Sequence, residues 1–338
     1  MNADANWLDR YRFCQPLGVG GMGQVYLAED RYNSSSKCVV KQLANKDNDP
    51  VEQAEAIRLF KREAQILRQL DHSGIVRIFD SYASQDGKYY LVMDYVPGKN
   101  LEVMIKTGGP FNSDLAIQLT MQCCDVLDYL HSREPPVIYR DLKPSNLMLT
   151  PEGRIVFIDF GIARLFMPRQ AATRVVTAGY SPPEQYFGKP ETRSDIYSLG
   201  ATLSHLLTGQ RPKPLASSTP ALVNSQVLPS LDRLVRRMTA HNPDDRPPTA
   251  AAVKYELMMV YKEIYPDYKL PDKPAASAAR SPSAAGQGTK ISSTPDWAEL
   301  SAGSNPAGST DSRTPASGHE RQGGLWKRFK QWLEILMS

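Results

Sequence analysis

The chain has 338 residues, and its 40 lysines and arginines against 36 aspartates and glutamates give a formal net charge of +4. An apolar share of 41% with 22% charged residues is ordinary for a folded globular protein. So small a charge excludes the strongly basic pattern of nucleic-acid-binding proteins, and we expect no nucleic-acid partner. The four cysteines are too few for a disulfide framework and lack zinc-module spacing, which indicates a reduced, cytoplasmic protein.

Composition divides the chain into four parts. No basic segment followed by an apolar run opens the sequence, and no run of about 18 apolar residues predicts a membrane-spanning helix. Between Pro271 and Glu320, alanine, serine, proline and glycine supply 31 of 50 residues, which is typical of a disordered linker. We therefore predict an N-terminal extension at 1–10, a folded domain at 11–268, a linker at 269–320 and a C-terminal segment at 321–338.

The folded domain begins with short runs rich in valine, isoleucine, tyrosine and phenylalanine, which predict β-strands. These runs cover 11–17, 24–30, 37–43, 76–82 and 89–95. Between the third and fourth runs, apolar residues at three- and four-residue steps predict a long helix from Val51 to Leu70. Further helical patterns cover 115–132, 195–209, 231–240 and 250–265. A small sheet with one helix, followed by a larger helical region, predicts an α+β fold with two lobes.

A glycine-rich segment separates the first two predicted strands and contains Gly18, Gly20, Gly21 and Gly23. Glycines at this spacing let backbone N–H groups approach a phosphate, because no Cβ atom interferes. The pattern also fits a plain hairpin turn or a dinucleotide-binding fold. The dinucleotide fold requires a helix directly after the glycines and an acidic residue about 20 positions on. Because a strand-like run and then Lys41 follow here, we discard that alternative.

Lys41 closes the run 38–41 inside the third predicted strand, at a position where alternation predicts burial. A buried ammonium group requires an anionic partner to remain charged, whereas most lysines at strand ends simply reach solvent. Glu63, close to the apolar face of the long predicted helix, is the candidate partner. Its position also fits an ordinary exposed helix carboxylate.

The segment 137–146 is a loop, because Pro144 and its mixed polarity exclude a regular helix. In this loop Asp141 can accept a proton, Lys143 can neutralise phosphate charge, and Asn146 can bind a hard divalent cation. The strand-like run 155–158 leads to Asp159, the first residue of an Asp-Phe-Gly triplet and a second candidate metal ligand. Such a triplet is frequent by chance, but one placed 18 residues after such a loop is rare.

The order and spacing of these motifs resemble the eukaryotic-like serine/threonine protein kinases over about residues 11–261. The blocks at 179–186 (GYSPPEQY) and 194–203 (SDIYSLGATL) are most similar to bacterial members. The resemblance implies a bilobal kinase fold at 11–268, with a small, mostly-β N-lobe and a larger, mostly-α C-lobe. It also implies ATP and Mg²⁺ as cofactors, with Mn²⁺ as an alternative metal, and transfer of phosphate to serine or threonine of protein substrates in bacterial signalling.

The resemblance assigns a role to each motif residue. It makes Asp141 the catalytic base, Lys143 a phosphate contact, and Lys41 a ligand of the α- and β-phosphates paired with Glu63. Asn146 and Asp159 become the metal ligands. Residues assigned to the nucleotide site, including the gatekeeper Met93 and the hinge at 94–96, are Leu17, Gly18, Gly20, Gly21, Gly23, Val25, Val39, Lys41, Met93, Asp94, Val96 and Met148. Residues assigned structural roles are Asp195, which holds the backbone of the catalytic loop, and the ion pair of Glu184 with Arg246.

Three residues carry the regulatory expectations. Arg140 precedes the catalytic aspartate, an arrangement in which family members use a phosphorylated activation loop. Thr173 and Thr177 are the only threonines between Asp159 and Glu184, and we expect autophosphorylation preferentially at Thr173. Thr177 matches the threonine that meets the acceptor residue, so we expect a structural role near the catalytic loop. That both are merely polar loop residues is the alternative.

Four positions depart from the family's usual residues, and none of them removes a catalytic group. Tyr139 replaces the usual histidine, Val39 a usual alanine, Val176 a usual glycine and Asp94 a usual hinge glutamate. A scaffold without catalysis is disfavoured because it predicts loss of a catalytic residue, and all are present. A small-molecule kinase is disfavoured by the intact peptide-docking motif at 177–184.

The C-terminal segment 321–338 predicts a short basic amphipathic helix, because its apolar residues recur at helical steps among three cations. It is too short to span a bilayer and too short to be stable alone in water. Two docking sites fit it equally well. One is anionic lipid on the inner face of the membrane, and the other is the chain's own helical lobe or another protein. The oligomeric state is left open.

Overall fold

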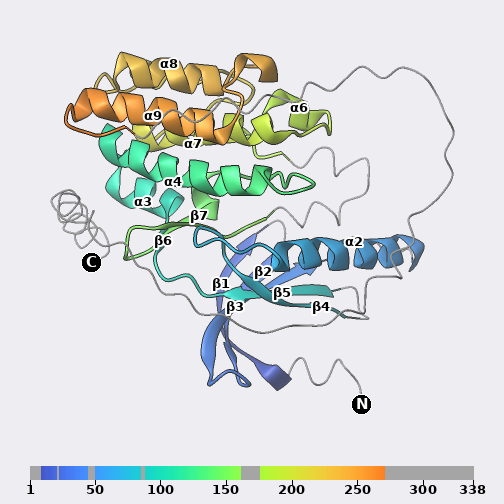
Figure 1. The fold of residues 1–338 in the computed structure, drawn as a ribbon. Helices are drawn as coiled ribbons and strands as arrows, with labels where there is room; N and C mark the ends of the chain where they lie inside the picture. The colour runs from blue at the N-terminus through green and yellow to red at the C-terminus, as the bar shows by residue number, and fades with distance from the viewer. Residues whose placement is uncertain (1–8, 21–22, 45–49, 85–87, 161–175, 271–338) are drawn as a thin grey trace, which may run out of the picture.

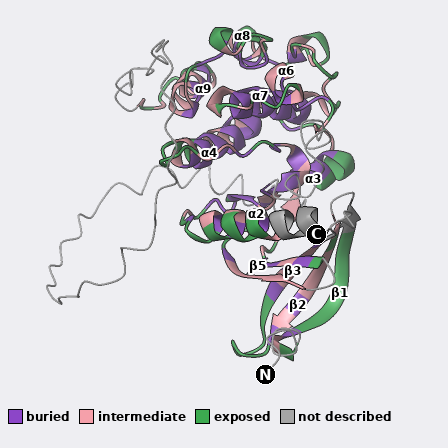
Figure 2. Ribbon diagram, turned by 90° about the vertical axis from the view of Figure 1, so that its right-hand side faces the viewer, coloured by how far each residue is buried: buried purple, intermediate pink, exposed green. Residues whose placement is uncertain are grey.

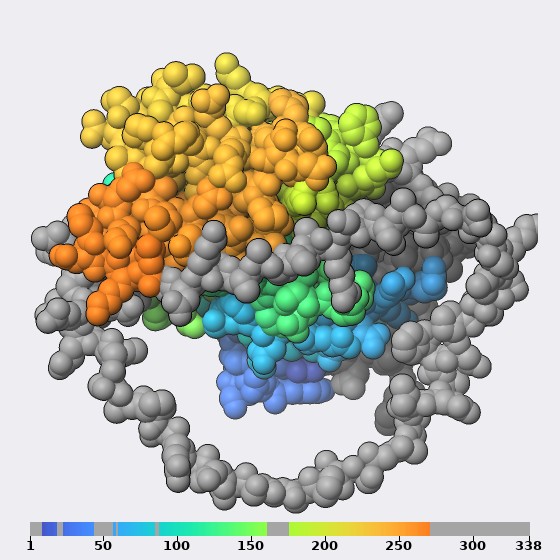
Figure 3. All heavy atoms as spheres, turned by 45° about the horizontal axis from the view of Figure 1, so that its top comes forward, coloured from blue at the N-terminus to red at the C-terminus, as the bar shows by residue number. Residues whose placement is uncertain are grey.

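The computed structural model describes residues 9–20, 23–44, 50–84, 88–160 and 176–270. Strands gather at one end of the molecule and helices at the other (Figure 1). The space-filling view shows the same order in colour, from blue strands at one end to the yellow and orange of the last described helices at the other (Figure 3). The predicted linker and the C-terminal segment 321–338 lie outside the described residues, so they remain predictions.

The N-terminal part is a five-stranded antiparallel sheet with the strand order β1-β2-β3-β5-β4. Its strands are β1 (Tyr11–Gly20), β2 (Gly23–Asp30), β3 (Ser36–Ala44), β4 (Ile78–Ala83) and β5 (Lys88–Asp94). The helix α2 (Pro50–Arg68) connects β3 to β4. All five strands and this helix confirm the elements that the sequence predicts.

The register of the five-stranded sheet determines which side chains share a face. Residues opposite one another in an antiparallel pair share a face, and so do residues two apart along a strand. Val25 pairs with Lys41, and Val39 pairs with Met93, so these four residues share one face. That face packs against α2, because Leu91 and Met93 belong to the same buried cluster as Phe60, Ala64 and Leu67.

The C-terminal part is mostly helical. Its helices are α3 (Leu101–Gly108), α4 (Ser113–His131), α6 (Pro183–Tyr186), α7 (Thr192–Thr208), α8 (Pro229–Met238) and α9 (Ala250–Ile264). A small antiparallel sheet, β6 (Lys99–Asn100), β7 (Leu147–Leu149) and β8 (Ile155–Phe157), lies beneath them. The sequence predicts α4, α7, α8, α9 and β8, but its patterns do not reveal α3, α6, β6 or β7.

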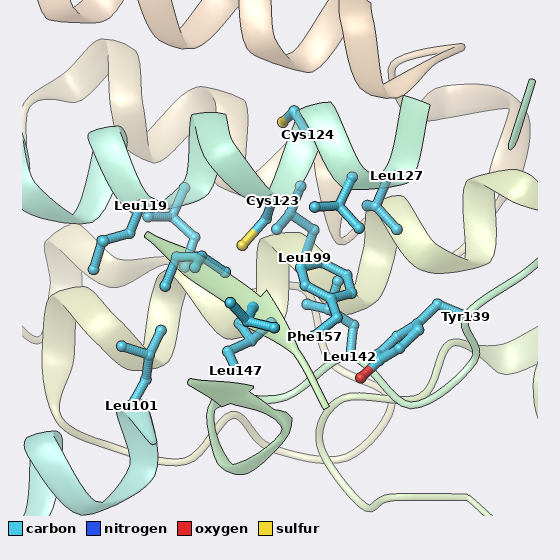
Figure 4. Close-up of a cluster of buried hydrophobic side chains, with 14 of the residues drawn as sticks. Leu101, Leu119, Cys123, Cys124, Leu127, Tyr139, Leu142, Leu147, Phe157 and Leu199 are labelled. Carbon is cyan, nitrogen blue, oxygen red and sulfur yellow. The ribbon is translucent and has the colours of Figure 1, made fainter. Parts of the chain in front are cut away.

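Helix α7 forms the centre of the helical part, and the burial colouring shows it almost wholly buried (Figure 2). Its neighbour α8 approaches closely at Gly200, where a Cβ atom would lie 2.6 Å from the Cβ atom of Met238. Leu199 of α7 joins Leu127 of α4 and Leu147 of β7 in one buried cluster (Figure 4). Because α7 is enclosed on all sides, a polar group on it is held rigidly.

Two further expectations concern cysteines and membranes. All four cysteines are free, and three of them are buried. Within the described ranges, no helix is both long and apolar enough to cross a bilayer.

Candidate active site

The buried Asp195 on α7 fixes the loop that follows α4. Its carboxylate accepts hydrogen bonds from the backbone N–H groups of Tyr139 and Arg140, both at 2.8 Å, and contacts Nε2 of His131 at 2.9 Å. Arg140 has a φ of +67°, a left-handed conformation that a side chain disfavours. The two backbone bonds to Asp195 help to hold this strained residue in place, as the resemblance implied for Asp195.

The carboxylate of Asp141 is the centre of a polar cluster. Its Oδ1 accepts a hydrogen bond from the hydroxyl of Thr177 at 2.7 Å. Its Oδ2 accepts hydrogen bonds from Nζ of Lys143 and Nδ2 of Asn146, both at 2.9 Å. Nζ of Lys143 also lies 3.3 Å from the hydroxyl of Thr177. The structure thus brings together all three loop residues that sequence reasoning selected and adds Thr177 from a distant segment.

Lys41 forms an ion pair with Asp159, with 2.5 Å between Nζ and Oδ1. Lys41 is buried, so its charge has the anionic partner that we expected. Within the described part of the chain no ion pair joins Lys41 to Glu63, and the pairing with Glu63 stays a prediction. Glu63 is half-buried on α2.

The positions assigned to the nucleotide come from both parts of the molecule. Val25, Val39 and Met93 lie on the face of the sheet that carries Lys41, and Met93 is buried. Met148 lies on β7 beneath the helical part and is half-buried, and Leu17 on β1 is exposed. Asp94 ends β5, and the exposed Tyr95 and half-buried Val96 follow it.

The glycine-rich segment joins β1 to β2, where Gly20 pairs with Gly23 in an antiparallel hairpin. Gly23 has a φ of +136°, and a Cβ atom there would lie 1.9 Å from the carbonyl oxygen of Gln42. The glycine at 23 is therefore required by the close approach of β3. A Cβ atom on Gly18 would meet nothing within 4 Å, so packing does not require glycine there. Gly21 lies outside the described residues.

Asn146 and Asp159 form a donor set that fits a hard divalent cation. Because Nδ2 of Asn146 donates to the backbone oxygen and to the carboxylate of Asp141, its amide oxygen is turned away and can bind a cation. The N–H of Ile158 donates to the carbonyl of Asn146 at 3.1 Å, which holds Asp159 beside the loop. Mg²⁺ typically takes one or two protein ligands and completes its shell with water and phosphate oxygens. In the described segments no cluster of three or more His, Cys, Asp or Glu side chains offers an alternative metal site.

Glu184 and Arg246 form the ion pair that the resemblance implied. The guanidinium group binds both carboxylate oxygens, with distances of 2.6 and 2.9 Å, and its side chain is 0% exposed. Burial alone would raise the pKa of Glu184, but hydrogen bonds from Arg246 and Ser194 outweigh it and lower the pKa below its ordinary value. The pair ties α6 to the segment before α9.

We expect Glu184→Ala to lower the free energy of unfolding by about 3–5 kcal/mol, because it leaves a buried guanidinium unpaired. Urea unfolding followed by circular dichroism measures this. The matched control is Glu256→Ala, which removes an exposed partner of Arg237 and should cost at most about 1 kcal/mol. Because folding lowers the pKa of Glu184, its contribution is complete above its ordinary value of 4.5 and declines as the pH falls below it. Equal losses in the two variants would contradict the expectation.

The regulatory residues are only partly described. Thr173 lies outside the described residues. Thr177 is half-buried, and its contacts with Asp141 and Lys143 agree with the expected structural role. The side chain of Arg140 is exposed.

Sequence reasoning missed several polar residues that support the site. His131 contacts Asp195, Ser194 donates to Glu184 at 2.6 Å, and Gln185 donates to the carbonyl of Arg140 at 3.1 Å. All three lie on helices, where a polar side chain usually faces solvent. The neighbourhood of Glu184 and Asp195 was the only available signal, since Gln185 and Ser194 directly adjoin these residues.

Comparison with known proteins agrees with this geometry. The protein kinase domain family matches residues 11–258. The serine/threonine-protein kinase PknB of Mycolicibacterium smegmatis is 34% identical over 289 residues, which cover 79% of this chain and 45% of that protein. The serine/threonine-protein kinase PknA of a Nostoc species is 34% identical over 259 residues, which cover 72% of this chain and 46% of that protein. The crystal structure of the Mycobacterium tuberculosis PknI kinase domain is similar with a TM-score of 0.60 and 26% identity, over 73% of this chain and 95% of that one.

The chain belongs to the protein kinase domain family, and the bilobal α+β fold that the sequence predicts is confirmed. Its relatives among the bacterial serine/threonine kinases confirm the resemblance stated from the motifs. Members of the family use ATP and a divalent metal ion. The chain spans less than half the length of the two curated relatives.

Proposed function

We propose that this chain transfers the γ-phosphoryl group of ATP, with Mg²⁺, to serine or threonine residues of proteins in bacterial signalling. The observation that carries the proposal is the cluster at Asp141. Its carboxylate already accepts a hydrogen bond from a threonine hydroxyl at 2.7 Å, with Nζ of Lys143 beside both groups. A base for an acceptor hydroxyl needs this distance to the proton that it takes.

The surrounding residues supply binding and charge. In this proposal Lys143 neutralises the phosphoryl group as it passes to the acceptor, and Lys41 binds the phosphates that remain. Asn146 and Asp159 would hold the divalent ion, which neutralises charge on the phosphate oxygens when it is bound. Catalysis of this kind depends mainly on positioning and electrostatics, which explains why Asp195 fixes the loop so firmly.

A direct assay tests the proposal. The purified chain is incubated with radiolabelled ATP, Mg²⁺ and a generic basic protein, and the labelled amino acids are then separated. We expect phosphoserine and phosphothreonine without phosphotyrosine. Because the four residues Lys41, Asp141, Asn146 and Asp159 are all present, a non-catalytic scaffold is the weaker alternative. Absence of label from both the chain and the added protein would support that scaffold and overturn the proposal.

We further expect the active chain to phosphorylate itself at Thr173 rather than at Thr177. The hydroxyl of Thr177 already contacts Asp141 and Lys143, while the exposed Arg140 is available to a phosphate. A phosphate adds about −1.5 to −2 charges and three acceptors that an arginine can bind at two points. Mass spectrometry of protein purified in the active form measures both sites. Full activity in protein that is unmodified at both threonines would contradict the expectation.

A further inference from the structure

Gln185 is a buried glutamine on the short helix α6, and only 5% of its surface is exposed. Its Nε2 donates one hydrogen bond to the backbone carbonyl of Arg140 and one to the hydroxyl oxygen of Ser181, both at 3.1 Å. A single amide group therefore contacts the loop that carries Asp141 and the segment that carries Thr177.

The contact with Gln185 also holds Arg140, the strained residue of the loop, at its carbonyl group. The N–H of Arg140 is bound by Asp195, and its carbonyl is bound by Gln185. A residue at a φ of +67° persists only where its surroundings hold it in that conformation. The orientation of the peptide that leads into Asp141 therefore depends on Gln185 as well as on Asp195.

The contacts also close a ring around the catalytic carboxylate. The hydroxyl oxygen of Ser181 accepts the N–H of Thr177 at 3.0 Å, and the hydroxyl of Thr177 donates to Asp141 at 2.7 Å. The ring runs from Gln185 through Ser181 and Thr177 to Asp141, and returns through the carbonyl of Arg140. Gln185 and Thr177 are the two members of the ring that link the loop carrying Asp141 to the segment carrying Ser181.

The other end of the same amide group argues against a packing role. Oε1 of Gln185 is buried and has no hydrogen-bond partner in the described part of the chain. A buried acceptor without a partner destabilises the fold, and a methionine of similar length would fill the space without that cost. The N–H donors of Gln185 are therefore the feature that the site uses.

We infer that Gln185 is a positioning residue for phosphoryl transfer, which sets the placement of the Arg140–Asp141 peptide relative to Thr177 and Ser181. The inference rests on the proposed function. It concerns the geometry of the acceptor side of the site, so loss of the two donors lowers kcat more than it changes the KM for ATP.

The test compares Gln185→Met with Gln118→Met in the full chain. Gln118 on α4 also donates a side-chain hydrogen bond, to the hydroxyl of Tyr261 at 3.0 Å, but it lies outside the ring. We expect Gln185→Met to lower kcat at least tenfold with less than a twofold change in the KM for ATP. Gln118→Met should match the wild type in both constants. If Gln185→Met does not fold, Ser181→Ala removes the Ser181 arm of the ring and should lower kcat in the same way.

Hydrogen–deuterium exchange tests the same geometry by a measurement that does not depend on kinase activity. In Gln185→Met, the amides of residues 138–142 and 176–182 should exchange at least tenfold faster than in the wild type, whereas Gln118→Met should leave them unchanged. An inactive wild type with this exchange pattern overturns the proposed function and supports only the hold of Gln185 on the two segments. An unchanged kcat and unchanged exchange in folded Gln185→Met overturn the inference, even if its melting temperature falls.

Discussion

Asp141→Asn is expected to lower kcat for phosphoryl transfer by about 10²–10⁴-fold, the usual contribution of a general base. Asparagine has the same shape: its one amide oxygen can accept from Lys143 and Asn146, and its NH2 group can donate to the hydroxyl oxygen of Thr177, so the loop should keep its geometry. What it loses is the ability to take the proton of the acceptor hydroxyl. Initial rates of transfer from ATP to a generic basic protein, at saturating ATP, measure the effect.

The control for this variant is Asp125→Asn. Asp125 is an exposed residue of α4 that pairs with Lys254, and exposed ion pairs contribute little. We expect its kcat and melting temperature to match those of the wild type. Asp141→Asn should melt near the wild-type temperature and still bind ATP. A folded Asp141→Asn protein that turns over at more than a tenth of the wild-type rate would show that Asp141 is not the base.

The strands and long helices could be predicted because each is determined by a local pattern. Alternating apolar residues between turns mark the five strands, and three- and four-residue spacing marks α2, α4, α7, α8 and α9. The strands that the sequence patterns do not reveal, β6 and β7, are short. The strand β6 has two residues and β7 has three, so neither shows a full period of alternation. They form because each pairs with a strand that is distant in the sequence. Lys99 pairs with Leu149, and Met148 pairs with Val156.

The same distinction separates the predictable part of the site from the rest. Asp141, Lys143 and Asn146 lie within six residues of one another, so one loop brings them together, and the sequence reveals it. Lys41 and Asp159 are 118 residues apart, and their contact depends on how the sheet sits against the helical part. Local periodicity cannot specify that placement. For this reason the sequence predicted an anionic partner for Lys41 and proposed Glu63, but it did not reveal the contact with Asp159.

Gln185 shows a further limit. A glutamine beside a glutamate on a short helix looks like an exposed surface residue, and its position next to Glu184 is the only sequence signal of its importance. It is buried on a helix that the Glu184–Arg246 pair anchors, and its amide contacts the loop that follows α4. Its role can be inferred only once the strained backbone of Arg140 and the free end of its amide are both known.

Lys41→Met is expected to abolish phosphoryl transfer while the protein stays folded. Lys41 is buried at the end of the face that carries Val25, Val39 and Met93, and its ammonium group lies 2.5 Å from Asp159. Methionine has a similar length and no charge, so it loses the contact with the phosphates. A buried charge-assisted contact contributes about 2 kcal/mol or more, which corresponds to a rate decrease of well over tenfold. Transfer rates and the KM for ATP measure this loss.

The melting temperature separates this loss of chemistry from a loss of folding. Asp159 keeps about a quarter of its side chain exposed (26%), so water can solvate its carboxylate when Lys41 is removed, and the fold should lose little stability. Lys37→Met is the matched control, because Lys37 lies on the same strand with an exposed side chain. We expect wild-type kinetics from it. Near-normal turnover in a folded Lys41→Met protein would refute the assignment of Lys41 to the ATP site. Among the described residues of this face of the sheet, only Lys41 forms an ion pair with Asp159.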